Sequence, residues 1–471
     1  MNEPNAYKRG FLPYALAALL IGLVGGFSAV LGPAFVADLG LGYHNTAWTT
    51  LAQAISTAAL SPILGNLGDT FGRRRMLTLG LILFTLGNLF SAIAPSLPVM
   101  IAARFLVGVG TAAMAPGILA YIASSFPREK VAGGYSLYML ISSASVILGP
   151  VLGGKLIAGS GWRTMLWVCV GISAGVLALC ALLPKGQEPS GKKRAVPFDL
   201  AGSALVLLFF GLALCIPAFG QNLGWDSPVF LWAIPLGAVS LAALIFVERR
   251  AQAPVLRGGL FRRPGFLLSI LILFLTQGLM QANMTSCIVF VNHTRPESTL
   301  VANYAISVMY LGMSLGAVLL GPLADRLSPG KLLPASLLLT ALGSGWMLLF
   351  TESTGAMVLM ASLGILGLGL GGNGTILMKV ALAGLSPGEA GSGTGTYGLF
   401  RDLAAPFGVA VLVPLFTNTV SELERAGLPA RQGAVQAIHR LAVFELAGVA
   451  AAICLALLLP VISGKEKPHE T

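Results

Sequence analysis

Long, unbroken apolar segments constrain this chain more than any other feature of its sequence. Stretches of about twenty apolar residues recur along the 471 residues, separated by charged or by glycine- and proline-rich positions. Lipid offers the backbone no hydrogen bonds, so a membrane-crossing segment must be a helix or a strand of a closed barrel. Barrel strands alternate apolar and polar residues over about ten positions, whereas these stretches are continuous. The sequence therefore predicts an all-α polytopic membrane protein.

Composition excludes the soluble classes of protein. Charged residues make up 10% of the chain and apolar residues 56%, whereas a soluble domain is about a quarter charged. The net charge of +11 arises from short basic clusters between apolar segments. The positive-inside rule accounts for such clusters in cytoplasmic loops, so no nucleic-acid partner is expected. The cysteines all lie in apolar segments, without metal-ligand or disulfide spacing, so no metal is expected.

The basic residues predict the topology. We expect fourteen spans, and an even number places both termini on the same side of the membrane. With the amino terminus inside, 21 Lys and Arg residues fall in inner segments and 6 in outer ones. The positive-inside rule therefore places both termini in the cytoplasm, and we expect a multi-pass protein of the plasma (inner) membrane.

One motif occurs twice, each time where an even-numbered predicted span ends on the cytoplasmic side. Its glycines permit a tight turn, and its acid can pair with the basic cluster or with a neighbouring helix terminus. A short cytoplasmic loop is often basic by chance, but recurrence of the whole pattern indicates an internal repeat. The first copy contains Gly65, Asp69, Gly72 and Arg73, and the second contains Gly321, Asp325 and Arg326.

These loops resemble the G-x-L-x-D-R-x-G-R-R motif of the major facilitator superfamily, with Thr70 in place of arginine. The segment from Arg104 to Gly110 resembles the family's fourth-span motif R-x-x-Q-G-x-G, with Val107 in place of glutamine. The two loop copies are 256 residues apart, which is longer than one six-span half. Two inserted spans account for the excess, so the sequence resembles the fourteen-helix branch of drug:proton antiporters.

The fifth predicted span carries a further resemblance, to the antiporter motif G-P-x-x-G-G. Proline removes a backbone donor and kinks a helix. The glycines are expected to allow close packing against a helix of the other half. The matching residues are Gly149, Pro150, Gly153 and Gly154.

The resemblance implies a major facilitator fold. Six-helix bundles are expected over residues 1–184 and 265–471, with cytoplasmic connectors and two inserted transmembrane helices over residues 185–264. The inserted pair comprises Leu200–Phe219 and Val229–Val247.

The resemblance also implies a function. We expect a secondary active transporter that works by alternating access, and specifically a proton-coupled exporter of hydrophobic or amphipathic small molecules, either multidrug or lipid-like. Its partners would be this substrate and membrane lipid, the proton would be the coupling ion without a further cofactor, and the chain would act as a monomer. An uncoupled facilitator of the same fold is the alternative. A membrane sensor or enzyme is a weaker one, because the sequence holds no catalytic cluster.

Ionisable residues inside predicted spans are candidates for a proton or charge site, because such groups are costly in a membrane. Adjacent residues on a helix point about 100° apart, so Arg401 and Asp402 need not touch. One interpretation has Asp402 facing Arg104 across a cavity, and the other is a structural salt bridge between two helices. For Glu445, an interfacial ion pair with Arg440 is favoured over a proton site.

The first predicted span departs from the family. The resemblance implies an acid there, but Val24 occupies the matching position, and no acid occurs between Glu3 and Asp38. Proton coupling would therefore use another carboxylate, either Asp402 or Glu445.

Uncharged polar and aromatic residues predict a cavity, since transport sites are usually apolar with a few polar groups. Gln277 and Gln281 are four residues apart and share a helix face, whereas Asn283 is turned well away from Gln281. Each such residue, taken singly, more often joins helices than binds a ligand. The cavity candidates are Trp48, Gln53, Tyr135, Tyr138, Gln277, Gln281, Asn283 and Asn373.

Overall fold

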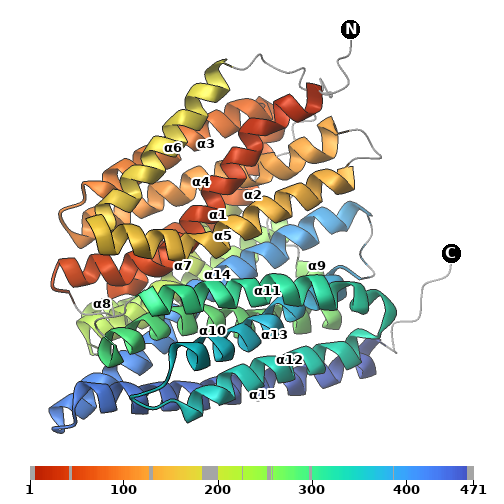
Figure 1. Cartoon of the computed structure of the whole chain (residues 1–471). Helices are drawn as coiled ribbons and strands as arrows, with labels where there is room; N and C mark the ends of the chain where they lie inside the picture. The colour runs from red at the N-terminus through yellow and green to blue at the C-terminus, as the bar shows by residue number, and fades with distance from the viewer. Residues whose placement is uncertain are drawn as a thin grey trace. The chain divides into compact units, whose positions relative to one another are not determined.

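A computed structural model describes residues 6–41, 45–126, 131–182, 200–224, 226–251, 256, 258–295, 300–383, 385 and 387–463. Within these ranges the regular structure is entirely helical. The chain divides into two compact units, Met1–Val255 and Leu256–Thr471. Each unit is a set of long helices that lie side by side (Figure 1).

The helices of the first unit are α1 (Ala6–Asp38), α2 (Thr46–Phe71), α3 (Arg73–Ala92), α4 (Leu97–Ser125), α5 (Val131–Ser160), α6 (Trp162–Leu182), α7 (Leu200–Leu223) and α8 (Pro228–Arg250). Those of the second unit are α9 (Gly258–Phe261), α10 (Pro264–Thr294), α11 (Leu300–Arg326), α12 (Pro329–Trp346), the 3-10 helix η4 (Met347–Leu349), α13 (Ala356–Leu382), α14 (Pro387–Arg425) and α15 (Ala430–Ser463).

Eleven helices in the described ranges are long and apolar enough to cross a membrane. They are α1, α3, α4, α5, α6, α8, α10, α11, α12, α13 and α15. The prediction of an all-helical polytopic membrane protein is thus confirmed. The three other long helices are α2, α7 and α14. Helix α7 contains a shorter apolar stretch, Ala201–Ala213, and α14 begins and ends in polar sequence.

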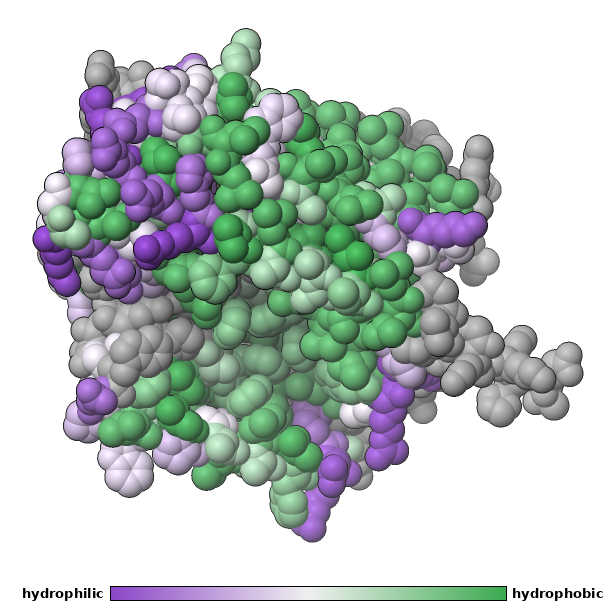
Figure 2. Space-filling view, turned by 90° about the horizontal axis from the view of Figure 1, so that it is seen from below, coloured by the Kyte–Doolittle hydropathy of each residue, from purple (hydrophilic) through white to green (hydrophobic). Residues whose placement is uncertain are grey.

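The surface of these helices is apolar. On α8, Leu231, Trp232 and Val239 are 55%, 76% and 64% exposed. The face seen in Figure 2 is covered largely by hydrophobic side chains, and hydrophilic ones gather toward its edges. An exposed apolar surface of this kind is unfavourable in water, whereas lipid chains solvate it.

Close helix packing holds the first unit together. A Cβ at Gly149 of α5 would lie 2.6 Å from the Cα of Gly26 in α1, so these two backbones touch. The predicted inserted pair belongs to this unit: α7 packs against α8 and α2, and the Phe219 ring lies 5.6 Å from that of Trp48.

In the second unit, the core is formed mainly by α10, α12, α13 and α15, with buried Leu273, Leu337, Ile376 and Val449. Helices α11 and α13 approach through glycines on both sides. A basic side chain caps the end of α11: the Lys379 ammonium of α13 donates a hydrogen bond to the Ala324 carbonyl of α11. Cations near the last carbonyls of a helix satisfy acceptors that lack an intrahelical partner.

The two copies of the repeated loop motif form different turns. In the first copy, Gly72 alone separates α2 from α3, with a φ of 99°, a conformation that glycine adopts without strain. In the second copy, Leu327 and Ser328 separate α11 from α12, and no residue there has a positive φ. The structure does not describe the surroundings of Gly65 or the side chains of Asp69, Asp325 and Arg326.

Candidate functional site

Arg104 is the largest polar side chain buried in the first unit. Its side chain on α4 is 2% exposed. Nη2 donates to Ser28 Oγ of α1 at 3.0 Å and to Gln53 Oε1 of α2. Nε and Nη1 have no hydrogen-bond partner among the described residues. The guanidinium is therefore a buried cation that contacts neutral oxygens and, in this part of the chain, no carboxylate.

Tight packing of α2 on α4 positions Gln53 for this contact. Ser56 Oγ of α2 donates to the Phe105 carbonyl of α4 at 2.9 Å. Gly108 of α4 lies so close to the Gln53 backbone that a Cβ would overlap it. Gln53, predicted to line a cavity, and Arg104, predicted at a charge site, therefore lie in contact.

Val24 explains why Arg104 has no acid beside it. Ser28 Oγ, which accepts from Arg104, donates to the Val24 carbonyl one turn earlier in α1 at 2.8 Å. Residues four apart lie on the same helix face. An acid at position 24 would therefore lie next to the Arg104 contact, and the buried Val24 side chain leaves that place apolar.

Arg401 and Asp402 form an ion pair with each other on α14. Arg401 Nε lies 2.9 Å from Asp402 Oδ1, and their side chains are 53% and 34% exposed. The arginine side chain is long enough to bridge the angle between adjacent positions. The ion pair that the structure shows for Asp402 therefore lies within one helix. Its role as a proton or charge site, or in a salt bridge between two helices, stays a prediction.

Glu445 is not in the interfacial ion pair with Arg440 that the sequence analysis favoured. Its side chain on α15 is fully buried, at 0% exposure, whereas Arg440 is exposed. Five positions along a helix turn a side chain by about 140°, onto nearly the opposite face. Both carboxyl oxygens lack a hydrogen-bond partner in the described part of the chain.

Polar side chains of α10 and α12 lie beside Glu445. The Asn283 amide and the Ser344 hydroxyl adjoin its carboxyl, but neither reaches it with hydrogen-bond geometry, since Asn283 Oδ1 and Ser344 Oγ are themselves buried without a partner. Asn283 Nδ2 donates to the Leu279 carbonyl at 3.1 Å. Asn283, predicted to line a cavity, is thus buried and bonded within its own helix, beside Glu445.

A stripe of hydroxyls continues from Ser344 along α12, with Thr340 and Ser336 at four-residue spacing. Ser336 Oγ donates to the Gly369 carbonyl of α13 at 2.8 Å. Asn373 Nδ2 of α13 donates to Thr340 Oγ1 at 3.2 Å. Asn373, expected in a cavity, therefore joins two helices.

The other cavity candidates are dispersed. Trp48 lines an apolar hollow of about 670 Å³ in the first unit. Gln277 and Gln281 are half-buried on one face of α10, and Tyr138 is half-buried on α5. The Tyr135 side chain lies outside the described residues. The residues that line the hollow are Trp48, Leu97, Pro98, Ile101, Ala102, Phe105 and Phe219.

The fifth-span motif packs within its own unit. Pro150 lies inside α5, and Gly154 is buried. Gly149 contacts Gly26, and a Cβ at Gly153 would lie 2.9 Å from the Phe27 ring of α1. The expectation that these glycines pack against the other half was wrong for Gly149 and Gly153, because α1 occupies that face.

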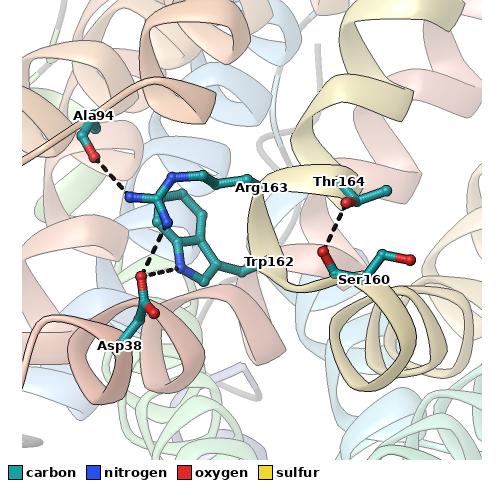
Figure 3. A network of polar contacts seen from close by, with 6 residues as sticks. All are labelled: Asp38, Ala94, Ser160, Trp162, Arg163 and Thr164. Atoms are coloured by element: carbon teal, nitrogen blue, oxygen red, sulfur yellow. Dashed lines mark hydrogen bonds and ion pairs between the residues drawn. The ribbon is translucent and has the colours of Figure 1, made fainter.

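At one end of the first unit, Asp38 joins α1 to α6 (Figure 3). Trp162 Nε1 and Arg163 Nη1 of α6 both donate to Asp38 Oδ2 at 3.0 Å. Arg163 also contacts the Ala94 carbonyl after α3, at 3.5 Å. Asp38 lies ten residues beyond the apolar span Gly10–Ser28. Its hydrogen bond with Trp162, and to a smaller extent the one with Arg163, holds the pKa of its carboxyl below the ordinary value of 3.8.

Asp38→Asn is expected to destabilise the protein by about 1 kcal/mol or less, since the Arg163 and Asp38 side chains are 44% and 47% exposed. A lowered pKa in the folded state stabilises it at pH values above the ordinary pKa, and this contribution is lost as pH falls through the folded value. The difference in melting temperature between wild type and variant should thus be present at pH 7 and shrink below about pH 4. Asp226→Asn, at an exposed acid between α7 and α8, is the control; an equal effect there would contradict the prediction.

Sequence reasoning missed Ser28 and Ser344, which contact the buried charges. The regular spacing of Ser336, Thr340 and Ser344 was a visible signal, because it marks one face of a helix. Ser28 carried no signal of its own. No cluster of three or more His, Cys, Asp or Glu residues that could hold a metal occurs in the part of the chain that the structure describes.

Long apolar helices that bury isolated ionisable side chains define a multi-pass helical membrane protein. The chain belongs to the Major Facilitator Superfamily, whose profile matches residues 14–409. The family resemblance is thereby confirmed. The fourteen-helix branch remains a prediction.

Individual relatives and a solved structure agree with this assignment. "Multidrug resistance protein Stp" of Mycobacterium tuberculosis (strain CDC 1551 / Oshkosh) is 29% identical over 82% of this chain and 72% of its own. "Puromycin resistance protein pur8" of Streptomyces alboniger is 29% identical over 88% and 81%. The fold is similar to the inward-facing crystal structure of a bacterial homologue of the human lysosomal transporter Spinster, with a TM-score of 0.70, 14% identity and full coverage of both chains.

Proposed function

We propose that this protein is a proton-coupled exporter that moves hydrophobic or amphipathic small molecules out of the cell by alternating access. The observation that carries the proposal is the likeness, over more than four-fifths of the chain, to relatives named for resistance to puromycin or to multiple drugs. Members of one family share a transport cycle more often than a substrate, so the substrate class rests on these names and on the apolar character of the chain. The protein transports without chemically changing its substrate, and needs no cofactor besides the proton.

The proposal includes a topology. All fourteen long helices cross the plasma membrane, α2, α7 and α14 included, and both termini are cytoplasmic. The positions of the basic residues support this arrangement. The chain acts as a monomer, with the substrate and membrane lipid as its partners.

The charged residues within the spans give this transporter its coupling. Asp402 and Glu445 in the second unit are the carboxyl groups that take up and release a proton during the cycle, and Arg104 in the first unit and Arg401 in the second are fixed positive charges that serve the same cycle. Their placement in membrane helices supports the assignment, because a charge there is retained against a large desolvation cost.

The test is transport by the purified protein in proteoliposomes. With puromycin and the hydrophobic cation ethidium as probes, an imposed pH gradient should drive transport against the substrate gradient. Collapse of the pH gradient by a protonophore should abolish this. A rate that is the same with and without the gradient would favour the uncoupled facilitator instead.

A further inference from the structure

Glu445 lies where α15 packs against α10 and α12 in the second unit, and its side chain is fully buried. On the buried face of α15, Leu441, Ala442, Val449 and Ala452 are all fully buried. Asn283 of α10 and Ser344 of α12 bring polar atoms next to the carboxyl. A carboxyl group with these neighbours has no nearby cation to neutralise it.

Counting donors and acceptors shows what this junction lacks. An ionised carboxylate only accepts hydrogen bonds. Asn283 already donates through Nδ2 to the Leu279 carbonyl, and its Oδ1 is a buried acceptor without a donor. A proton on Glu445 supplies a donor next to that acceptor. The second N–H of Asn283 and the Ser344 hydroxyl can donate to either form of the carboxyl. Only the protonated form can also donate to Asn283 Oδ1, so it satisfies one more buried atom of this junction than the ionised form does.

Charged groups on the surrounding helices do not change this count. The elements packed against α15 are α10, α12, α14 and η4. Within the described residues, both carboxyl oxygens of Glu445 lack a hydrogen-bond partner, and His293 and His439 each bond a backbone carbonyl instead. The titratable groups of these elements and of α15, besides Glu445, are His293 and Cys287 on α10; Lys331 on α12; Glu389, Tyr397, Arg401, Asp402, Glu422, Glu424 and Arg425 on α14; and Arg431, His439, Arg440 and Cys454 on α15; η4 has none.

We propose that Glu445 carries the coupling proton, and that Asn283 and Ser344 hold its protonated form in the closed junction of α10, α12 and α15. This inference rests on the proposed function and names the residue that performs its coupling. Asp402 differs, because Arg401 already neutralises its charge.

The proton balance is simple. Glu445 takes a proton from water on one side to become a carboxylic acid, and releases it to water on the other side to become a carboxylate again. The ionised form needs hydration that the closed junction does not provide. Deprotonation therefore favours a conformation in which the junction admits water, which links the proton to helix movement.

The experiment compares full-length wild type with Glu445→Gln in proteoliposomes. The neutral amide can donate to Asn283 Oδ1, so the variant should fold. Transport of puromycin or ethidium driven by a pH gradient should fall about tenfold or more. Difference infrared spectra give a readout independent of substrate: the carbonyl band of a buried protonated acid should titrate in wild type and be absent from Glu445→Gln.

Glu424→Gln, at an exposed acid near the end of α14, is the matched control and should keep both the band and the coupling. If wild type ignores the pH gradient, the proposed function fails. If wild type is coupled and Glu445→Gln is equally coupled, this inference alone is overturned. Should Glu445→Gln not fold, Glu445→Asp decides: a displaced acid should shift the pH dependence of the band and of transport, and an unchanged pH profile would overturn the proposal.

Discussion

Gly371→Ala is expected to destabilise the second unit by about 1–3 kcal/mol, as overpacking of a tight contact does. A Cβ at Gly371 of α13 would overlap the carbonyl oxygen of Met313 in α11. The obstacle is backbone, which cannot rotate away as a side chain does. Thermal unfolding of the purified protein in detergent measures the effect.

Gly374, three residues further along α13, is the matched control. A Cβ there would meet nothing within 4 Å, and alanine favours a helix over glycine by up to about 1 kcal/mol. Gly374→Ala should therefore leave stability unchanged or raise it. Equal melting temperatures for the two variants would contradict the contact between α11 and α13.

The same contact between α11 and α13 involves four glycines, so replacing two of them should reduce stability more than replacing one. Gly312 and Gly316 of α11 are four residues apart, as are Gly367 and Gly371 of α13, and a Cβ at any of them would overlap backbone of the other helix. This is the G-x-x-x-G pattern, which lets membrane helices approach closely. The double variant Gly367→Ala/Gly371→Ala should be less stable than either single variant.

This contact illustrates what the sequence can and cannot predict. Both glycine pairs are visible in the sequence, and each predicts a small-residue helix face. The partner is not visible, because α11 and α13 are separated by α12 and any other small-residue face would fit as well. Apolar segments predict helices through local hydrophobicity, whereas helix pairing depends on shapes that only the folded chain defines.

For the charged residues too, the sequence predicts which residues matter but not which residues they contact. Their scarcity in apolar segments identified Arg104, Asp402 and Glu445 from the sequence alone. Their partners were harder to predict. The contact between Arg104 and Gln53 joins positions 51 residues apart, so no local spacing signals it. The supposed pair of Glu445 and Arg440 is different, since helical geometry alone places them on nearly opposite faces.

Arg104→Met is expected to abolish transport, with a loss of tenfold or more, while the protein remains folded. Replacing a buried charge that lacks a counter-ion by an apolar side chain of similar length is often neutral or stabilising. The variant loses the hydrogen bonds of Nη2 to Ser28 and Gln53, and an orphaned buried acceptor costs about 1–3 kcal/mol. These effects oppose each other, so we expect little change in melting temperature. A tenfold loss of rate corresponds to about 1.4 kcal/mol in the transport barrier.

A double-variant cycle with Gln53→Leu separates the structural part of this effect from the functional part. Gln53→Leu in wild type removes one of the two oxygens that Nη2 contacts, and should destabilise the protein by about 1–3 kcal/mol. In the Arg104→Met background, the same change removes the orphaned acceptor and should be neutral or stabilising. Transport should stay lost in both variants that lack Arg104. A charge that serves the transport cycle is needed for turnover and not for packing. Normal transport by Arg104→Met, or failure of this variant to fold, would therefore make Arg104 a structural residue of the α2–α4 contact.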